Sequence, residues 1–295
     1  MNRLFRTIRH GLRSRRQFYS PIVNPYDDRV QRILKQHATS ELSDQEDIQI
    51  DVVALKEMFF EIASAYPDLP FSDQPEQGFR YHYKNPSFSY GDAITLFGMM
   101  RHFKPKRIVE VGSGYSSCLL MDTNDRFFDG SINLTFIDPY PQALKRLLRE
   151  DDKYQSHLRC EALQDVPTAL FRELSGNDIL FIDSSHVAKT GSDVNDYLFR
   201  ILPALHPGVI VHIHDIPYPF EYPPDWILKD ERSWNEVYVL RAFLQYNSSF
   251  KIIYFNHLMY RRFADLLEEH MPLCLKNCGA SIWLKKTSAP GPVGF

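Results

Sequence analysis

From residue 107 onward, short apolar runs alternate with stretches of helical length. Strands that alternate with helices form a parallel sheet with helices on both faces. Each helix carries the chain back to the end at which the previous strand began, so the next strand runs in the same direction. The apolar runs show little alternation with polar residues, as expected of strands buried on both faces. The pattern predicts an α/β fold whose doubly wound, mostly parallel sheet has seven strands: RIVEV, INLTFID, HLRCEAL, DILFID, GVIVHIHDI, FKIIYFN and ASIWLKK.

The chain ahead of this alternation is expected to be helical. Residues 27–66 favour helix, most clearly in DVVALKEMFFEIASAY, which Asp51 can cap. A second helix is predicted in SYGDAITLFGMMRHF. The helical extension is a candidate cap or dimerisation arm, so a homo-oligomer is one expected state. We therefore predict three parts: a basic tail over 1–26, a helical extension over 27–90 and the main domain over 91–295.

Basic residues are concentrated at the start of the chain. The first 26 residues carry six arginines and no acid, which leaves 28 basic and 37 acidic residues in the remainder. The start suits a weak contact with an anionic membrane surface or a mitochondrial presequence, and a solvated basic tail is the alternative. The acidic remainder argues against a nucleic-acid partner.

Apolar run length and cysteine spacing indicate the compartment. No apolar run approaches the roughly 18 residues that span a bilayer. The four cysteines include one C-x3-C pair, without the second pair that would complete a zinc site. We predict free thiols in a reducing compartment, and hence a cytoplasmic protein.

Two glycines follow the first predicted strand in RIVEVGSGYSSCLL, a strand–turn–helix layout typical of nucleotide binding. Ser117 stands where a dinucleotide fingerprint has its third glycine. No lysine or arginine lies between Gly112 and Asp122 to meet a phosphate. Glu110 would repel a pyrophosphate and attract an ammonium or sulfonium group. The turn therefore predicts a cofactor that carries a positive charge close to the turn.

Acids also follow the next two strands. Asp138 ends the second strand, where a carboxylate can accept both ribose hydroxyls. Asp165 follows the third strand and is placed to accept a hydrogen bond from an adenine amino group. A cationic cofactor with a ribose and an adenine is predicted.

Four motifs in this order, VEVGSGYSS, FIDPY, LQDV and LFIDSSH, resemble class I S-adenosylmethionine-dependent methyltransferases over about residues 90–286. The resemblance implies S-adenosylmethionine as the cofactor. It also implies that the glycines let the backbone approach the methionine part. The cofactor-binding set that it implies is Glu110, Gly112, Ser113, Gly114, Asp138, Asp165, Val166 and Asp183.

Titratable residues follow the fourth and fifth strands, in FIDSSHVAKT and HIHDIPYPFEYP. Methyl transfer to a hydroxyl needs alignment and removal of a proton, and imidazole suits the second task because its ordinary pKa of about 6.5 is near neutrality. We expect His186 or His214 to be the general base, with Asp183 and Asp215 orienting it. His212 is expected to be packed, with a backbone partner.

This region also resembles the metal-using branch of the family, such as macrolide-sugar O-methyltransferases and cephalosporin-hydroxylase-like proteins. There an Asp ends strand four and a Glu-Asp pair ends strand five. Asp183 and Asp215 match this pattern, but His214 stands where the Glu would be. A divalent metal (Mg, Mn or Fe) on Asp183, His214 and Asp215 is therefore one interpretation, with softer ions favoured over magnesium. Metal-free base catalysis is the other.

The aromatic loop PYPFEYPPDW and the segment SWNEVY are expected to cover the reacting face. Aromatic residues with few lysines suit a small-molecule or glycan hydroxyl as acceptor. A metal-dependent oxygenase, or a non-catalytic cofactor-binding module, remains the alternative function. The candidate substrate contacts are Tyr90, Trp234, Asn235 and Glu236.

Overall fold

The computed structural model describes residues 20–39, 48–149 and 152–288. Most of the predicted basic tail, residues 1–19, lies outside these ranges. Within them, no helix combines the length and the apolar character needed to cross a membrane. The four cysteines are free thiols in this structure.

Seven strands form one sheet in the order β3-β2-β1-β4-β5-β7-β6. Strands β1 to β5 run parallel to one another, and β7 lies between β5 and β6, antiparallel to both. The predicted α/β fold with a mostly parallel, doubly wound sheet is confirmed. The strands are β1 (Arg107–Val111), β2 (Asn133–Ile137), β3 (Leu158–Arg159), β4 (Ile179–Ile182), β5 (Ile210–Ile213), β6 (Phe250–Phe255) and β7 (Ile282–Lys286).

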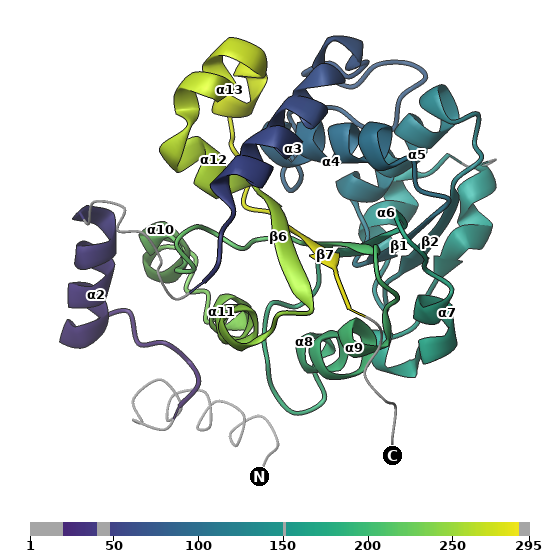
Figure 1. Cartoon of the computed structure of the whole chain (residues 1–295). Helices are drawn as coiled ribbons and strands as arrows, with labels where there is room; N and C mark the ends of the chain where they lie inside the picture. Colours follow the sequence, from purple (N-terminus) through teal and green to yellow (C-terminus); the bar gives the residue numbers. More distant parts are fainter. Residues whose placement is uncertain (1–19, 40–47, 150–151, 289–295) are drawn as a thin grey trace.

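Helices lie on both sides of the sheet, with α3, α4 and α5 above it and α8, α9 and α11 below it in Figure 1. A π-helical segment, Tyr197–Ile201, joins α8 to α9. The helices are α2 (Asp28–Thr39), α3 (Val52–Ser64), α4 (Tyr90–Phe103), α5 (Tyr115–Phe127), α6 (Gln142–Leu147), α7 (Thr168–Arg172), α8 (Asp193–Asp196), α9 (Leu202–Ala204), α10 (Pro224–Leu228), α11 (Glu236–Tyr246), α12 (Asn256–Arg262) and α13 (Ala264–His270).

Among its described residues, the region predicted to be helical over 27–66 contains two helices, α2 and α3, and residues 48–50 ahead of α3 are not helical. Asp51 caps α3 as predicted, and its carboxylate accepts a hydrogen bond from the backbone N–H of Ala54 at 3.1 Å. The helix then packs against α4 and β6. The approach to α4 is close, since a Cβ on Gly98 would lie 2.5 Å from Ile62.

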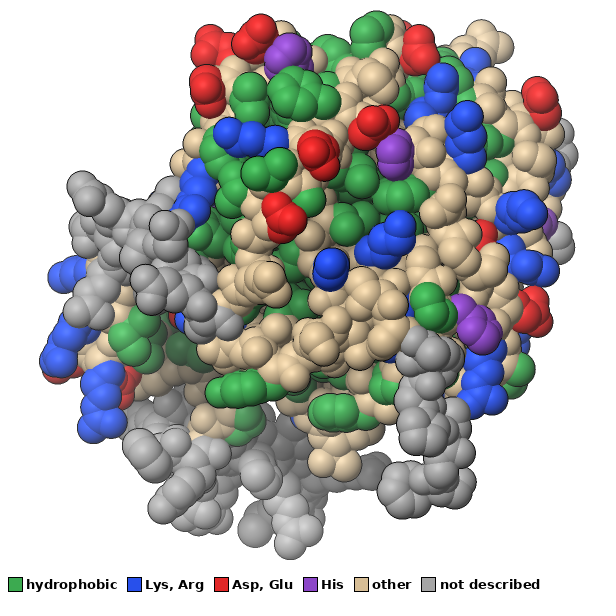
Figure 2. All heavy atoms as spheres, in the orientation of Figure 1, with side chains coloured by type: hydrophobic (Ala, Val, Ile, Leu, Met, Phe, Trp, Pro, Cys, Tyr) green, Lys and Arg blue, Asp and Glu red, His purple; other side chains and the backbone are tan. Residues whose placement is uncertain are grey.

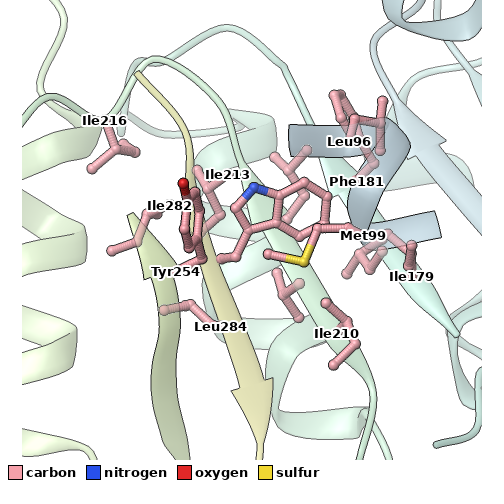
Figure 3. Packing of buried hydrophobic residues seen from close by; sticks show 14 of the residues in the cluster. Leu96, Met99, Ile179, Phe181, Ile210, Ile213, Ile216, Tyr254, Ile282 and Leu284 are labelled. Atoms are coloured by element: carbon pink, nitrogen blue, oxygen red, sulfur yellow. The ribbon is translucent and has the colours of Figure 1, made fainter. Parts of the chain in front are cut away.

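Apolar side chains between α4 and the sheet form the core beneath the site. In Figure 3, Leu96 and Met99 of α4 lie beside Phe181 of β4, and Tyr254 of β6 lies beside Ile282 of β7. All five are at most 1% exposed. Each such side chain contributes roughly 1.5–3 kcal/mol by leaving water. This packing fixes α4 against the strand ends that carry the site.

Charged side chains are dispersed over the surface in Figure 2, where acidic and basic groups are interspersed with apolar ones. No single sign of charge dominates the visible described part of this face.

Candidate functional site

The turn between β1 and α5 requires glycine at one position and leaves space at the other. Gly112 has a left-handed φ of 86°, and a Cβ there would lie 1.8 Å from the carbonyl oxygen of Asp183. Gly112 therefore allows the ends of β1 and β4 to meet. Gly114 is extended, and a Cβ added there would meet nothing within 4 Å. Its backbone is open to approach.

Glu110 lies behind this turn rather than in its open side. The side chain is fully buried, and its two oxygens accept hydrogen bonds from the hydroxyls of Ser116 and Ser117, each at 2.5 Å. Burial raises the pKa of Glu110 to about 8, against the lowering effect of the two hydroxyl donors. The carboxyl group thus stabilises the first turn of α5, and no cofactor contact follows from its position.

A cavity of about 390 Å³ lies beside the turn, between the ends of β1, β2 and β4. Asp138 lines it, and its carboxylate is held by Ser113 Oγ at 2.6 Å and by the Tyr140 backbone N–H at 2.7 Å. Two donors leave a carboxylate further lone pairs for ribose hydroxyls. We call this space the cofactor cavity.

The segment after β3 contributes different residues from those predicted. Leu163 and Gln164 line the cofactor cavity, whereas Asp165 is exposed and outside its lining. Val166 is buried, and its carbonyl accepts a hydrogen bond from Arg200 at 2.9 Å. An adenine contact by Asp165 therefore has no support in this geometry.

Two buried histidines face each other across two aspartates after β4 and β5. His186 Nε2 and His214 Nδ1 are each 3.4 Å from the same oxygen, Asp183 Oδ1. The two carboxylate oxygens of Asp215 lie 3.7 Å from these same nitrogens. We call these four residues the His–Asp cluster. The structure thus brings together the four residues that the strand ends predicted.

The outer nitrogen of each imidazole meets a second buried carboxylate. His186 Nδ1 is 2.8 Å from Glu236 Oε2, and His214 Nε2 is 3.2 Å from Asp92 Oδ2. The other oxygen of Glu236 accepts a hydrogen bond from the Tyr197 hydroxyl at 2.7 Å. The outer carboxylates fix both ring orientations. Sequence reasoning missed this role for Asp92 and Glu236.

Backbone conformation at the cluster is unusual for side-chain-bearing residues. His186 and Asp215 both have left-handed backbones, with φ of 57° and 56°. Non-glycine residues in this region cost on the order of 1 kcal/mol or more, and such strain persists where the surroundings impose it. Here the loops after β4 and β5 bring the His186 ring to Asp183 and the Asp215 carboxylate to the two imidazoles.

The neighbouring carboxylates keep the imidazoles of His186 and His214 protonated. Burial alone would lower the pKa of His186, but Asp183 and Glu236 raise it to about 10. For His214, burial again opposes the charged form, and Asp183, Asp215 and Asp92 raise its pKa well above the ordinary value. Asp183 shows the converse: burial is outweighed by the two histidines, which hold its pKa well below the usual range. Without bound ligands, both rings are imidazolium at neutral pH.

The predicted metal ligands lie together but not in a coordination geometry. Among the described residues, no three or more His, Cys, Asp and Glu side chains are arranged to hold a metal ion. Asp183, His214 and Asp215 meet at ion-pair distances instead. His214 Nδ1 is nevertheless buried without a hydrogen-bond partner in the part of the chain that the structure describes. The residues do not fit a metal ion without rearrangement.

A second cavity, of about 550 Å³, lies on the other side of the cluster, and we call it the acceptor cavity. Asp183 lines both cavities. Trp234 lines the acceptor cavity, and its ring lies 4.2 Å from that of His186 between centroids. A group in the cofactor cavity and a substrate in the acceptor cavity would therefore meet at Asp183.

The other three predicted substrate contacts lie outside this lining. The Tyr90 hydroxyl donates to Asp73 at 2.8 Å. Asn235 stabilises the loop after β4, because its side-chain oxygen accepts a hydrogen bond from the Ala188 N–H at 2.6 Å. Glu236 is fully buried beneath His186. Only Trp234 therefore keeps the predicted substrate role in this geometry.

His212 is packed, as predicted, against Phe181 at 3.8 Å and Trp283 at 4.7 Å between ring centroids. The predicted backbone partner is wrong, since neither ring nitrogen has a hydrogen-bond partner among the described residues. Burial lowers its pKa well below the ordinary value. The ring is therefore neutral and belongs to the core.

Comparison with known proteins gives one family match and one close relative. Residues 109–216 match the family model described as a methyltransferase domain. A protein of Archaeoglobus fulgidus, described as uncharacterized, is 33% identical over 169 residues, which cover 55% of this chain and 73% of that protein.

Two solved structures are similar at low identity. The apo-structure of CmcI-N160 is 19% identical with a TM-score of 0.41, covering 68% of this chain and 73% of that one. An SAH-bound methyltransferase of Podospora anserina is 13% identical with a TM-score of 0.38, covering 88% and 95%. Both likenesses are too distant to carry a conclusion about function.

Proposed function

The chain belongs to the class I methyltransferase family, and we propose that it transfers the methyl group of S-adenosylmethionine to a hydroxyl of a small molecule or glycan unit. The observation that carries the proposal is the pair of cavities that share Asp183. One offers a carboxylate for a ribose, and the other is lined by three residues of the His–Asp cluster, Asp183, His214 and Asp215.

The charge of the cofactor cavity supports a cationic nucleoside. Its described lining includes Asp138, Asp183 and Asp193 and no lysine or arginine. Carboxylates attract a sulfonium and repel a pyrophosphate. When bound, S-adenosylmethionine supplies a methyl group that is already activated for displacement. Asp138 would bind the ribose, and the open backbone at Gly114 would face the methionine part.

The acceptor side must align a hydroxyl and take its proton. Glu236 and Asp92 orient the two imidazoles and direct their inner nitrogens toward Asp183. An imidazole fixed in this way can receive a proton from a bound hydroxyl. A cationic cofactor beside Asp183 disfavours the imidazolium form, because like charges repel. We therefore assign proton removal to His186 or His214.

A divalent metal on Asp183, His214 and Asp215 is the alternative. The Nδ1 of His214, which makes ion pairs but no hydrogen bond among the described residues, favours it. The observed arrangement of the described side chains does not. Elemental analysis of the purified protein, together with turnover after exhaustive chelation, decides between the two. Turnover that requires oxygen and iron would indicate an oxygenase instead.

The first experiment is calorimetry with four compounds. We expect S-adenosylmethionine and S-adenosylhomocysteine to bind, and NAD and ATP not to bind. A library of hydroxyl-bearing compounds is then offered with S-adenosylmethionine, and release of S-adenosylhomocysteine is measured. Binding without release for any compound would favour a non-catalytic module. Clear binding of NAD or ATP, with no heat from the methyl donor, would refute the assignment.

A further inference from the structure

Arg232 is the one lysine or arginine in the lining of the acceptor cavity, counted over the described residues. The same lining carries Asp92, Asp183 and Asp215. A single permanent cation therefore lines this cavity. Its other charged residues belong to the His–Asp cluster, apart from Asp92, which contacts His214.

Two tryptophans hold the Arg232 guanidinium in place. Its central carbon lies 4.5 Å from the ring centroid of Trp226 and 4.3 Å from that of Trp234. The Arg232 backbone N–H also donates to the Trp226 carbonyl at 2.9 Å. Stacking on aromatic faces restricts the plane of a guanidinium, so less freedom is lost when its donors bind a ligand.

The donors of this guanidinium are largely uncommitted. Within the described ranges it makes one ion pair, from Nε to Asp230 Oδ2 at 3.2 Å, and no hydrogen bond. The side chains of that pair are 32% and 48% exposed, and exposed pairs stabilise little. Asp230 is outside the lining of the acceptor cavity. The guanidinium is thus available to a ligand.

The position of Arg232 relates it to the reacting groups. Trp234 contacts the guanidinium and also the ring of His186, at 4.2 Å between centroids. His257, which also lines the cavity, accepts from the Tyr218 N–H and is neutral, because burial lowers its pKa to about 4. The His214 ring also lines the cavity but is already paired with Asp92 and Asp183. Arg232 is therefore the cation available to a substrate anion near the cluster.

We propose that the acceptor is a small hydroxy acid whose carboxylate is bound by Arg232 while its hydroxyl reaches the His–Asp cluster. Guanidinium donors match a carboxylate in a two-pronged geometry. Three aspartates in the lining favour a single negative charge over the double charge of a phosphate ester. This inference rests on the proposed methyl transfer and adds the class of acceptor.

The test uses matched acid and amide pairs with S-adenosylhomocysteine present. The pairs are glucuronate with glucuronamide, and 4-hydroxybenzoate with 4-hydroxybenzamide; glucose 6-phosphate represents the dianion. We expect at least one acid to bind about tenfold more tightly than its amide, the usual effect of a charge-assisted hydrogen bond. Glucose 6-phosphate should bind more weakly than glucuronate.

The variants separate charge from packing. Arg232→Gln should abolish the acid preference. Arg232→Lys should retain only part of it, because an ammonium group lacks the two-pronged donor geometry of a guanidinium. Arg126→Gln is the matched control: its guanidinium lies 3.7 Å from the Phe79 ring, outside the acceptor cavity, and its loss should leave the preference unchanged. S-adenosylhomocysteine affinity should be the same in all three variants.

Several results would overturn the inference while leaving the proposed function intact. These are no binding by either acid, equal binding of acid and amide, tighter binding of the phosphate ester, or an acid preference that survives in Arg232→Gln. Failure of the proposed function is distinguishable, because the wild-type protein would then not bind S-adenosylhomocysteine, or would release none from S-adenosylmethionine with any hydroxyl-bearing compound.

Discussion

Asp92 and His214 are 122 positions apart in the chain, yet the Asp92 carboxylate lies 3.2 Å from His214 Nε2 inside the protein. Asp92 is in the first turn of α4, and His214 directly follows β5. The aspartate is itself held by Asn256 at 3.1 Å, and Gly279 leaves room for it, since a Cβ there would lie 2.3 Å from its carboxyl. Glu236 supports His186 in the same way from α11.

Removal of the outer carboxylate on His186 should reduce turnover. Glu236→Gln keeps the size of the side chain but loses the charge that orients the imidazole. We expect a loss on the order of 100-fold in the rate of S-adenosylhomocysteine release, typical of impaired acid–base catalysis. Cofactor affinity by calorimetry should be unchanged.

The matched control for this variant is Tyr197→Phe, which removes only the hydroxyl that donates to Glu236. It should lose much less activity, because the carboxylate remains beside His186. Equal losses in both variants, or unchanged turnover in Glu236→Gln, would show that Glu236 does not position the base.

The sequence predicted the cluster because the carboxyl ends of parallel strands meet at one edge of a sheet. Asp183 and Asp215 were found in this way. Asp92 was not, because its contact with His214 depends on how α4 is placed against the sheet, and no local sequence pattern reports that placement. Glu236 was assigned to the substrate, since the start of a helix is visible in sequence but the direction of its first turn is not.

Turn geometry also limited the sequence prediction at the cofactor cavity, both in the LQDV segment and at Glu110. The LQDV segment was placed correctly after β3, but the 3₁₀ turn Leu163–Asp165 directs Leu163 and Gln164 to the cavity and leaves Asp165 exposed. Glu110 was predicted to attract the cofactor charge, but the serines of α5 enclose it. Turn geometry decides both outcomes, and residue type alone does not.

Asp138 and Asp165 should respond differently to the same substitution. Asp138→Asn removes a charge from the cavity wall, and we expect S-adenosylhomocysteine affinity to fall about tenfold, since a charged hydrogen-bond acceptor is lost. Asp165→Asn should bind normally because Asp165 is outside the lining. Calorimetry on both variants checks this, and a larger effect at Asp165 would contradict the assigned cavity.

The glycines of the turn should separate stability from binding. Gly112→Ala places a Cβ 1.8 Å from the Asp183 carbonyl in a left-handed backbone, so we expect a loss of about 2 kcal/mol or more in the free energy of unfolding. Gly114→Ala meets nothing within 4 Å and should unfold normally. It should weaken S-adenosylhomocysteine binding instead. Urea unfolding and calorimetry measure the two effects, and normal binding by Gly114→Ala would show that the cofactor does not approach there.

Glu110 should make stability depend on pH. Its pKa rises from 4.5 to about 8 in the folded protein, so folding favours the protonated carboxyl. The stabilisation is complete below pH 4.5 and is lost as the pH rises through 8. At about 1.4 kcal/mol per pKa unit, we expect a loss of roughly 2–4 kcal/mol between about pH 5 and 8.5.

The isosteric variant Glu110→Gln isolates this effect from all other titrating groups. Its amide cannot ionise, so its free energy of unfolding should fall less than that of the wild type over the same pH range. Urea unfolding of both proteins at about pH 5, 6.5 and 8.5 gives the comparison. Parallel pH profiles would mean that the buried carboxyl is already ionised at pH 5, with the two serine hydroxyls sufficient to stabilise its charge.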